Sequence, residues 1–233
     1  MTLPAPAPAA TDPGATPVRY AAWAVYARTG VIDRPTDATA EMSRWSDALA
    51  DDDVVARGVY DVSGLRADAD LMVWLHGPTA EALQEALRGF RRTAVGDATR
   101  LAFSLLGTHR PAEFTRDHVP SFMRGTDALG WLCVYPFVRS YDWYLLPEDE
   151  RRALLSEHGL AARAFPRVQA NTVAAFGLND YEWILALEAD DLHDLVDLMR
   201  HLRATGARRH VREEVPFYTG RRVDASGAIE VLR

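Results

Sequence analysis

The chain has 233 residues, of which 48% are hydrophobic and 25% charged, with a formal net charge of -7 and a sequence pI near 5.5. This composition is that of an ordinary globular protein, and the negative charge disfavours nucleic acid as a partner. The single cysteine, Cys133, excludes an intramolecular disulfide, and the complete absence of lysine excludes both a Schiff-base lysine and a phosphate-binding P-loop.

The first 17 residues are rich in proline and alanine and lack the cationic and apolar regions of a signal peptide, so they are predicted to be a disordered tail. No run of 18 apolar residues is present, which predicts no transmembrane helix. Together with the lone cysteine, these features lead us to expect a cytoplasmic protein.

The hydrophobic pattern from residue 18 to residue 110 predicts one β-α-β-β-α-β unit. Its expected elements are a strand at 20–26, a helix at 41–49, strands at 57–62 and 71–76, a helix at 78–90 and a strand at 101–106. Gly64 and the four residues after it are typical of the connection between two antiparallel strands.

Residues 127–233 are predicted to repeat the same order. The expected elements are a strand at 131–139, a helix at 148–165, strands near 172–176 and 181–187, a helix at 190–203 and a strand near 214–218. Two such units predict an α+β fold of two ferredoxin-like halves, whose antiparallel sheets pack into a barrel-like core with helices outside. Residues 111–126 join the halves as a long polar loop, a type of segment that often carries function.

His158 lies on the predicted helix that begins after Pro147. Helical spacing places it on an apolar face together with Leu154, Leu155, Ala161, Ala162 and Phe165. Such a face usually points to the core, where a hydrogen-bonded histidine is commoner than a metal ligand. Gly159 follows at once and costs about 1 kcal/mol inside a helix relative to alanine. Close approach of a flat ligand such as an iron porphyrin would explain this glycine, and a local helix break is the alternative.

Tyr135 and Arg139 share one face of the strand predicted at 131–139, because alternate side chains of a strand point the same way. At about 3.3 Å per residue they stand about 13 Å apart. A phenol and a guanidinium on one face suit a ligand that carries carboxylates. The alternative is an aromatic residue inside the barrel with an arginine at its rim. Pro136 has no N–H to donate, which predicts a strand edge or a bulge.

His118 lies in the polar loop near Arg116, Asp117 and Arg124. Imidazole titrates near neutral pH, which suits proton transfer, although most loop histidines are simply solvated. The remaining histidines show no metal-ligand spacing and are predicted to be structural: His76, His109, His193, His201 and His210. A group of arginines is either a solvated face or an anion-binding site: Arg203, Arg208, Arg209, Arg212, Arg221 and Arg222.

Three motifs carry a family resemblance. They are Tyr-Pro-Phe-Val-Arg-Ser-Tyr-Asp-Trp-Tyr-Leu-Leu-Pro from residue 135, Glu-His-Gly-Leu-Ala-Ala-Arg from residue 157 and Asn-Asp-Tyr-Glu-Trp-Ile-Leu-Ala-Leu-Glu from residue 179. Together they resemble the coproheme decarboxylases, the haem-synthesising members of the chlorite-dismutase-like superfamily, over residues 18–223. The resemblance implies two ferredoxin-like halves per subunit, a homopentamer, and an iron porphyrin held in the second half.

The resemblance also implies roles for single residues. His158 matches the proximal iron ligand, and Tyr135 matches the tyrosine whose radical starts each decarboxylation. His118 matches the distal histidine of one branch of the family, and Arg139 a basic residue that contacts propionate. Further residues are expected around the substrate: Trp143, Trp183, Ala207 at the access channel, and Arg208.

The implied reaction is a hydrogen peroxide-dependent oxidative decarboxylation. Two propionates of coproheme become vinyl groups, and haem b forms through a monovinyl intermediate. Coproheme is then both substrate and redox cofactor, hydrogen peroxide is the co-substrate, and a coproporphyrin ferrochelatase is a transient contact.

Two other functions stay open. One is a chlorite dismutase or peroxidase on the same fold, which is disfavoured because residues 168–180 contain no arginine to serve as the distal arginine of chlorite-degrading relatives. The other is a haem carrier or sensor without catalysis. A carrier needs only the iron ligand, so the presence of Tyr135 beside Arg139 together with His118 disfavours this function.

Overall fold

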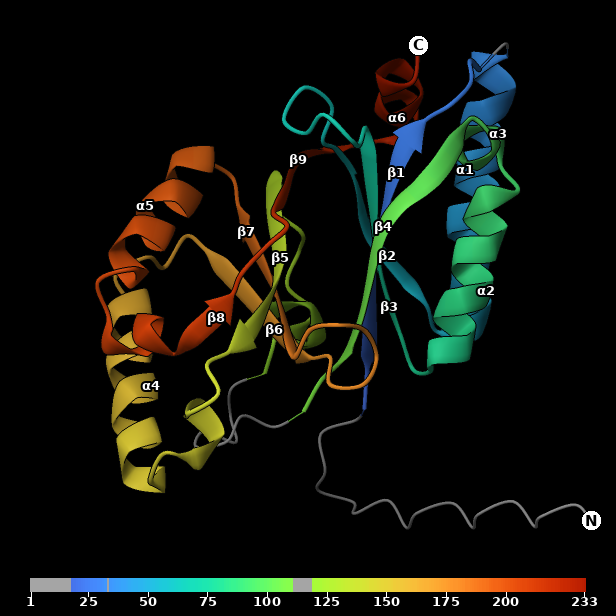
Figure 1. Cartoon of the computed structure of the whole chain (residues 1–233). Coiled ribbons are helices and arrows are strands. Elements are labelled where there is room, and N and C mark those ends of the chain that lie inside the picture. Colours follow the sequence, from blue (N-terminus) through green and yellow to red (C-terminus); the bar gives the residue numbers. More distant parts are fainter. Residues whose placement is uncertain (1–17, 33, 111–118) are drawn as a thin grey trace, which may run out of the picture.

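Strands rich in buried apolar residues form the centre of the molecule, and amphipathic helices cover them. The computed structural model describes residues 18–32, 34–110 and 119–233 (Figure 1). The first half contains β1 (Tyr20–Arg28), α1 (Pro35–Ala48), η1 (Leu49–Asp52), β2 (Val55–Asp61), β3 (Leu71–Gly77), α2 (Ala80–Arg91), α3 (Ala94–Asp97) and β4 (Thr99–Thr108). After η2 (Ser121–Arg124) the second half contains β5 (Trp131–Arg139), η3 (Trp143–Leu145), α4 (Glu148–Ala162), β6 (Gln169–Ala174), β7 (Trp183–Ala189), α5 (Leu192–Leu202), η4 (Gly206–His210), β8 (Val211–Glu213), β9 (Tyr218–Val223) and α6 (Ala225–Val231).

The strands form one antiparallel sheet that closes on itself. The first half runs in the order β4-β1-β3-β2 and the second in the order β9-β5-β7-β6, so corresponding strands occupy the same place in each half. β2 pairs with β9 at Val59↔Val223, and β4 pairs with β6 at Thr108↔Ala174, which joins the halves along both edges. β8 adds to the end of β5. The predicted α+β fold of two ferredoxin-like halves around a barrel-like core is confirmed.

The repeat extends to the turns between paired strands. Gly64, between β2 and β3, and Gly177, between β6 and β7, both have φ of +71°. Glycine adopts this left-handed conformation at little cost because it has no Cβ. Each glycine lies inside an isolated bridge, Ser63↔Arg66 in the first half and Phe176↔Asn179 in the second. The connection predicted at Gly64 is confirmed, and its counterpart at Gly177 shows the same backbone geometry.

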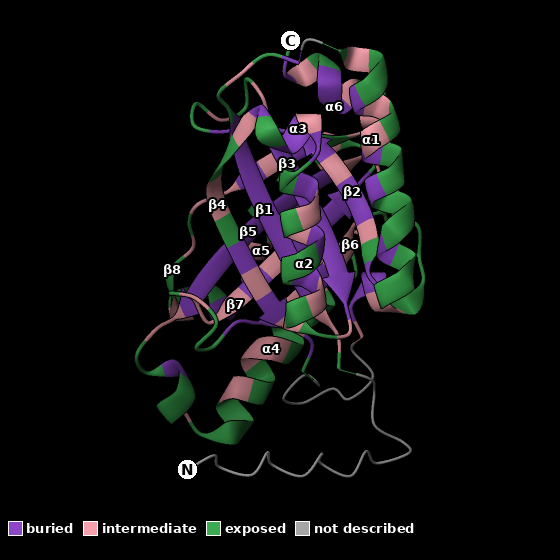
Figure 2. Cartoon of the chain, turned by 90° about the vertical axis from the view of Figure 1, so that its right-hand side faces the viewer, coloured by how far each residue is buried: buried purple, intermediate pink, exposed green. Residues whose placement is uncertain are grey.

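Three hydrophobic clusters stabilise the fold. Residues of both halves fill the barrel interior, among them Trp23 and Trp74, whose ring centroids lie 5.3 Å apart. A second cluster lies between the first sheet and helices α1, α2 and α6, and a third lies between the second sheet and α5. Figure 2 shows the buried strands behind helices whose outer faces are exposed. The third cluster contains Tyr135, so it places the predicted site on the helical side of the second sheet.

The prediction of a strand near 214–218 is wrong. β8 ends at Glu213 and β9 begins only at Tyr218, with Pro216 between them. Proline has no N–H to give to a strand ladder, so pairing stops on both sides of it.

The last helix, α6, was not predicted because its seven residues are too few for a clear period. It packs against α1 and belongs to the hydrophobic cluster of the first half.

A buried ion pair ties the two halves to the segment that joins them. Arg57 of β2 binds Glu188 of β7 with 2.8 Å between Nη2 and Oε1, and their side chains are 6% and 0% exposed. Arg57 also donates to the carbonyl oxygens of Thr126 at 2.7 Å and Asp127 at 3.2 Å. The backbone N–H of Leu129 donates to Glu188 Oε2 at 3.2 Å. One arginine and one glutamate thus fix the described end of the connecting segment against both sheets.

Candidate active site

Most predicted site residues lie in the second half, on the side of its sheet that the helices cover. β5 carries Tyr135 and Arg139, η3 carries Trp143, α4 carries His158, β7 carries Trp183, and η4 carries Ala207 and Arg208. β5 has the bounds that the sequence predicts, and alternation along it separates Tyr135 from the barrel interior. His118 lies outside the described residues, so its role stays a prediction.

α4 presents His158 from a half-buried face. The helix begins after Pro147 and continues without a break through Gly159 to Ala162, which rules out the alternative of a local helix break. No residue of α4 is fully buried, and the helix packs chiefly against α5 and η4. The face predicted to point into the core is therefore only half-buried. A Cβ on Gly159 would meet no atom within 4 Å, so no protein neighbour requires this glycine.

Thr205 determines which nitrogen of His158 carries the proton. Nδ1 lies 3.2 Å from the Thr205 hydroxyl oxygen. That hydroxyl donates its one proton to the carbonyl oxygen of Leu202 at 2.9 Å, so it must accept a proton from Nδ1. Nε2 then keeps its lone pair and makes no hydrogen bond with the described part of the chain. A neutral imidazole held at one nitrogen and open at the other is the usual form of a histidine metal ligand.

The surroundings of His158 also favour the neutral ring. Burial lowers the pKa of His158, and the positive charge of Arg139 lowers it further, while Glu157 acts in the opposite direction. A histidine whose pKa lies below its ordinary value is neutral at pH 7. The ring is thus ready to donate its lone pair without first losing a proton.

Arg139 connects His158 with the aromatic residues of the site. Its guanidinium carbon lies 4.1 Å from the ring centroid of Trp143 and 5.1 Å from that of Phe137. Its backbone N–H donates to Glu182 Oε2 at 2.8 Å, which fixes the end of β5. The positive charge of Arg139 also lowers the pKa of His158.

Tyr135 is 4% exposed and lies between the second sheet and α5. This position excludes the alternative of an aromatic residue inside the barrel. Its ring stacks on Phe217 at 4.4 Å, and its hydroxyl donates to the thioether of Met199 at 3.5 Å, which is a weak acceptor. Burial strongly raises the pKa of Tyr135, and the carboxylate of Glu214 raises it further. The phenol is therefore neutral and keeps its proton.

Two arginines share one carboxylate close to Tyr135. Glu214 binds Arg203 at 2.6 Å and Arg208 at 2.5 Å. Both positive charges counteract the rise in the pKa of Tyr135. Ala207, between them in the chain, is 4% exposed. The predicted arginine group is divided, because Arg212 stacks on Tyr141, Arg221 lies 3.8 Å from Asp61, and Arg222 lies on β9.

Trp183 lies beside a tyrosine that the sequence analysis did not single out. Its Nε1 donates to the hydroxyl of Tyr144 at 3.1 Å, and that hydroxyl donates to Glu182 Oε2 at 2.9 Å. The ring of Phe176 packs edge-on against Trp183 with 5.4 Å between centroids. Trp183 is thus held at its nitrogen and on one edge.

Comparison with known proteins places the chain in a family. The family model described as "Chlorite dismutase" matches residues 35–223, which is most of the chain. The chain belongs to the chlorite dismutase family. Within this family, a coproheme decarboxylase of Mycolicibacterium smegmatis is 52% identical over 225 residues, covering 92% of this chain and 94% of that protein. The resemblance to coproheme decarboxylases is thereby confirmed.

Solved members of the chlorite dismutase family share the fold. The chlorite dismutase of Candidatus Nitrospira defluvii in complex with imidazole superposes with a TM-score of 0.80 at 22% identity, covering 92% of this chain and 94% of that one. A proposed heme-binding protein of Natronomonas pharaonis is 28% identical over 200 residues, which cover 76% of this chain and 33% of that protein.

The residues of this family member fit an iron porphyrin that carries carboxylates. His158 offers a lone pair at Nε2, and Arg139, Arg203 and Arg208 provide guanidinium groups on the same side of the sheet. Guanidinium pairs with carboxylates in a bidentate way, so these arginines suit propionates. No helix within residues 18–32, 34–110 and 119–233 is long and apolar enough to cross a membrane.

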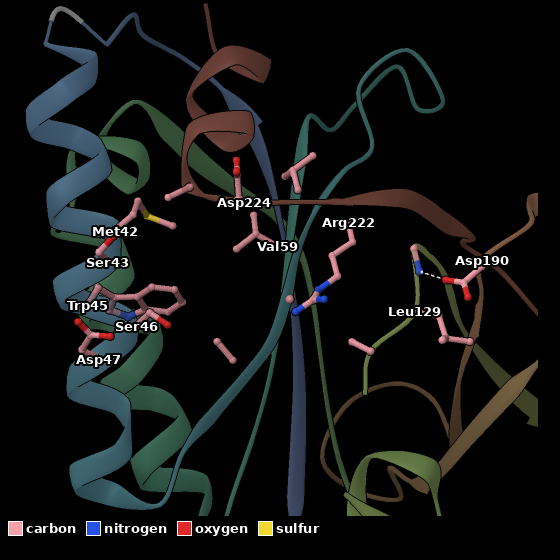
Figure 3. A pocket seen from close by; sticks show the side chains of 16 residues that line it. Met42, Ser43, Trp45, Ser46, Asp47, Val59, Leu129, Asp190, Arg222 and Asp224 are labelled. Carbon is pink, nitrogen blue, oxygen red and sulfur yellow. Dashed lines mark hydrogen bonds between the residues drawn. The ribbon is translucent and has the colours of Figure 1, made fainter. Parts of the chain in front are cut away.

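A separate cavity of about 750 Å³ is lined by residues of both halves. Figure 3 shows the side chains that line it. Trp45, Val59, Leu129 and Arg222 line it, and none of the residues expected to contact the iron, the peroxide or the propionates does. The predicted active site is therefore separate from this cavity.

We predict that His158 Nε2 would bind porphyrin iron, so we expect His158→Ala to abolish this binding and Thr205→Val to weaken it. Loss of an outer partner of a ligating histidine typically lowers affinity by about 10- to 100-fold. Titration of the ligand-free protein with ferric coproporphyrin III, followed by absorption spectroscopy, measures both effects. Thr99→Val, which removes another threonine-to-carbonyl hydrogen bond far from the site, is the control. An unshifted spectrum in His158→Ala would contradict ligation, and wild-type affinity in Thr205→Val would contradict the role of Thr205.

Proposed function

We propose that the chain decarboxylates coproheme with hydrogen peroxide and converts two propionates to vinyl groups, with haem b as the product. The observation that carries this proposal is the buried phenol of Tyr135 on the helical side of the second sheet, in the half that also carries Arg203 and Arg208 on Glu214. It occurs in a chain that is 52% identical to a coproheme decarboxylase. For each propionate the balance is one propionic acid side chain and one hydrogen peroxide, giving one vinyl group, one carbon dioxide and two water molecules.

The side chains have separate tasks in this reaction. His158 binds the iron through Nε2, and Arg139, Arg203 and Arg208 hold the propionates. Bound coproheme, together with hydrogen peroxide, supplies the oxidising chemistry. Tyr135 gives up one electron and its hydroxyl proton, and its phenoxyl oxygen then takes a hydrogen atom from the β-carbon of a propionate. Loss of carbon dioxide and of one further electron leaves the vinyl group.

The surroundings of Tyr135 support this task. Its pKa is raised, so the group that reacts is a neutral phenol and not a phenolate. Its hydroxyl donates to a thioether, and no residue that the structure describes places a strong base against it, so the phenoxyl oxygen can still take a hydrogen atom. We assign His118 to the transfer of the peroxide proton, as a general base and then a general acid.

Both propionates must reach Tyr135 in turn, so the monovinyl intermediate has to move within the site. Ionic contacts with arginines allow this movement because they are not covalent. We place the access channel at Ala207 and pocket walls at Trp143 and Trp183. The proposal also includes a homopentamer and transient contact with a coproporphyrin ferrochelatase, which the family resemblance supports. It further includes a cytoplasmic location, which the single cysteine supports.

The proposal is tested by adding ferric coproporphyrin III and hydrogen peroxide and measuring the mass of the porphyrin. We expect products lighter by one and then two formic-acid equivalents. An unchanged mass with tight binding would support a haem carrier. A rapid release of oxygen from chlorite, measured with an oxygen electrode, would support a chlorite dismutase.

A further inference from the structure

Tyr144 forms a hydrogen-bonded chain that begins at Trp183 and ends at a carboxylate. The indole Nε1–H donates to the phenol oxygen at 3.1 Å, and the phenol O–H donates to Glu182 Oε2 at 2.9 Å. Trp183 is half-buried, whereas Tyr144 is 42% exposed. The chain therefore runs from the predicted substrate site to the surface.

The neighbours of this chain hold it in one geometry. The ring of Phe176 packs edge-on against both aromatic rings, with 5.4 Å to Trp183 and 6.0 Å to Tyr144. Glu182 Oε2 also accepts the backbone N–H of Arg139 at 2.8 Å, which orients the carboxylate. The phenol therefore has a fixed donor on one side and a fixed acceptor on the other.

Other tyrosine hydroxyls of the described chain have different partners. The hydroxyl of Tyr135 donates to the thioether of Met199, and the hydroxyl of Tyr141 accepts from Arg212. The hydroxyl of Tyr60 is buried in the barrel and makes no hydrogen bond with any described residue. None of these three can pass its proton to a carboxylate at hydrogen-bond distance. Tyr144 can pass its proton to Glu182. This makes Tyr144 easier to oxidise than the other three, because a phenol loses an electron more easily when a base takes its proton.

We propose that Tyr144 and Glu182 form a redox outlet for Trp183. A one-electron oxidant first removes an electron from the indole of Trp183, which becomes a radical cation. Tyr144 then returns one electron to the indole and gives its hydroxyl proton to Glu182. The indole radical cation, phenol and carboxylate become a neutral indole, a phenoxyl radical and a carboxylic acid, so charge and atoms balance.

The outlet moves a radical from the substrate site to an exposed side chain, where reductants in solution can quench it. Burial raises the pKa of Tyr144, the bond from Trp183 acts against this rise, and Glu182 adds to it, so the phenol keeps its proton until it is oxidised. The inference depends on the proposed function only for the source of the oxidant. In the proposed decarboxylation, the source is an oxidising equivalent that does not react with propionate.

Pulse radiolysis of the ligand-free protein tests the proposal without any substrate. Azidyl radicals oxidise tryptophan, and the decay of the tryptophan radical with growth of the tyrosyl radical is followed by absorbance. We expect a fast intramolecular phase in the wild type that disappears in Tyr144→Phe and in Trp183→Phe. In Glu182→Gln the phase should slow at least about tenfold, since general-base assistance typically contributes about 10² or more.

The chain has 6 tryptophans and 8 tyrosines, so radical transfer between other pairs must be distinguished from this phase by controls. Tyr141→Phe, which removes an exposed hydroxyl bound to Arg212, should leave the fast phase unchanged. A fast phase that survives Tyr144→Phe would overturn the proposal, and an unaltered rate in Glu182→Gln would overturn the role of the carboxylate. If Tyr144→Phe does not fold, the Glu182→Gln rate and the slowing of the wild type in D₂O decide the question. A failure to decarboxylate coproheme would leave this experiment intact, so the two proposals fail separately.

Discussion

Tyr135→Phe is expected to bind coproheme like the wild type and to form neither the monovinyl intermediate nor haem b. The phenylalanine ring can stack on Phe217 as the tyrosine does, but it has no hydroxyl hydrogen to lose. We expect turnover to fall at least about a thousandfold, which corresponds to about 4 kcal/mol in the barrier. Mass spectrometry of the porphyrin after peroxide addition, with a parallel binding titration, measures both quantities.

The fold should tolerate Tyr135→Phe, because the lost hydrogen bond ends on a thioether. We expect a change in the free energy of unfolding below about 1 kcal/mol. Tyr60→Phe removes an equally buried hydroxyl in the barrel interior and is the matched control, with full activity expected. Retained decarboxylation in Tyr135→Phe would remove the radical role from this residue.

Arg57→Met is expected to lower the free energy of unfolding far more than Tyr135→Phe does. The substitution leaves the carboxylate of Glu188, which is 0% exposed, without its counter-charge. It also takes the guanidinium donor from two carbonyl oxygens of the connecting segment, those of Thr126 and Asp127. Breaking a buried pair in this way typically costs about 3 to 5 kcal/mol. Urea unfolding followed by tryptophan fluorescence measures the loss.

The double variant Arg57→Met with Glu188→Gln shows whether the cost comes from the stranded charge. Glutamine keeps an acceptor for Asn171 but carries no charge, so we expect the double variant to recover more than half of the loss. Arg88→Met, which breaks an exposed ion pair with Glu85, should change stability by less than about 1 kcal/mol. If the double variant were as unstable as Arg57→Met plus Glu188→Gln added together, the two side chains would not be coupled.

Local patterns in the sequence predicted the elements that carry the site. β5 has the predicted bounds because alternating apolar residues and the polar end at Arg139 are sufficient to define a strand. α4 begins where Pro147 and three acidic residues predict a helix start, although it ends three residues earlier than expected, at Ala162. The roles of His158 and Tyr135 came from the family resemblance, because spacing alone left a core histidine and a barrel aromatic open.

Some expectations failed or were incomplete where neighbours decide the outcome. The helical face of His158 looked like a core face, but it is half-buried because its helix packs chiefly against a neighbouring helix and a short turn. The arginines from Arg203 to Arg222 looked like one group, but folding sends them to different surfaces. Only Arg203 and Arg208 meet, on Glu214.

The sequence by itself determined the two β-α-β-β-α-β units, the face of β5 that Tyr135 shares with Arg139, and the family. These follow from periodicities and motifs in which all the informative residues are close in the chain. Only the tertiary structure decided the proton position on His158, the carboxylate beside Tyr144 and the buried pair of Arg57 with Glu188. Their partners lie 47, 38 and 131 residues away, so no local pattern could record them. Closure of the barrel brings Arg57 to Glu188, because pairing of β2 with β9 and of β4 with β6 fixes one half against the other. The other two pairs form within the second half, between elements that folding brings together.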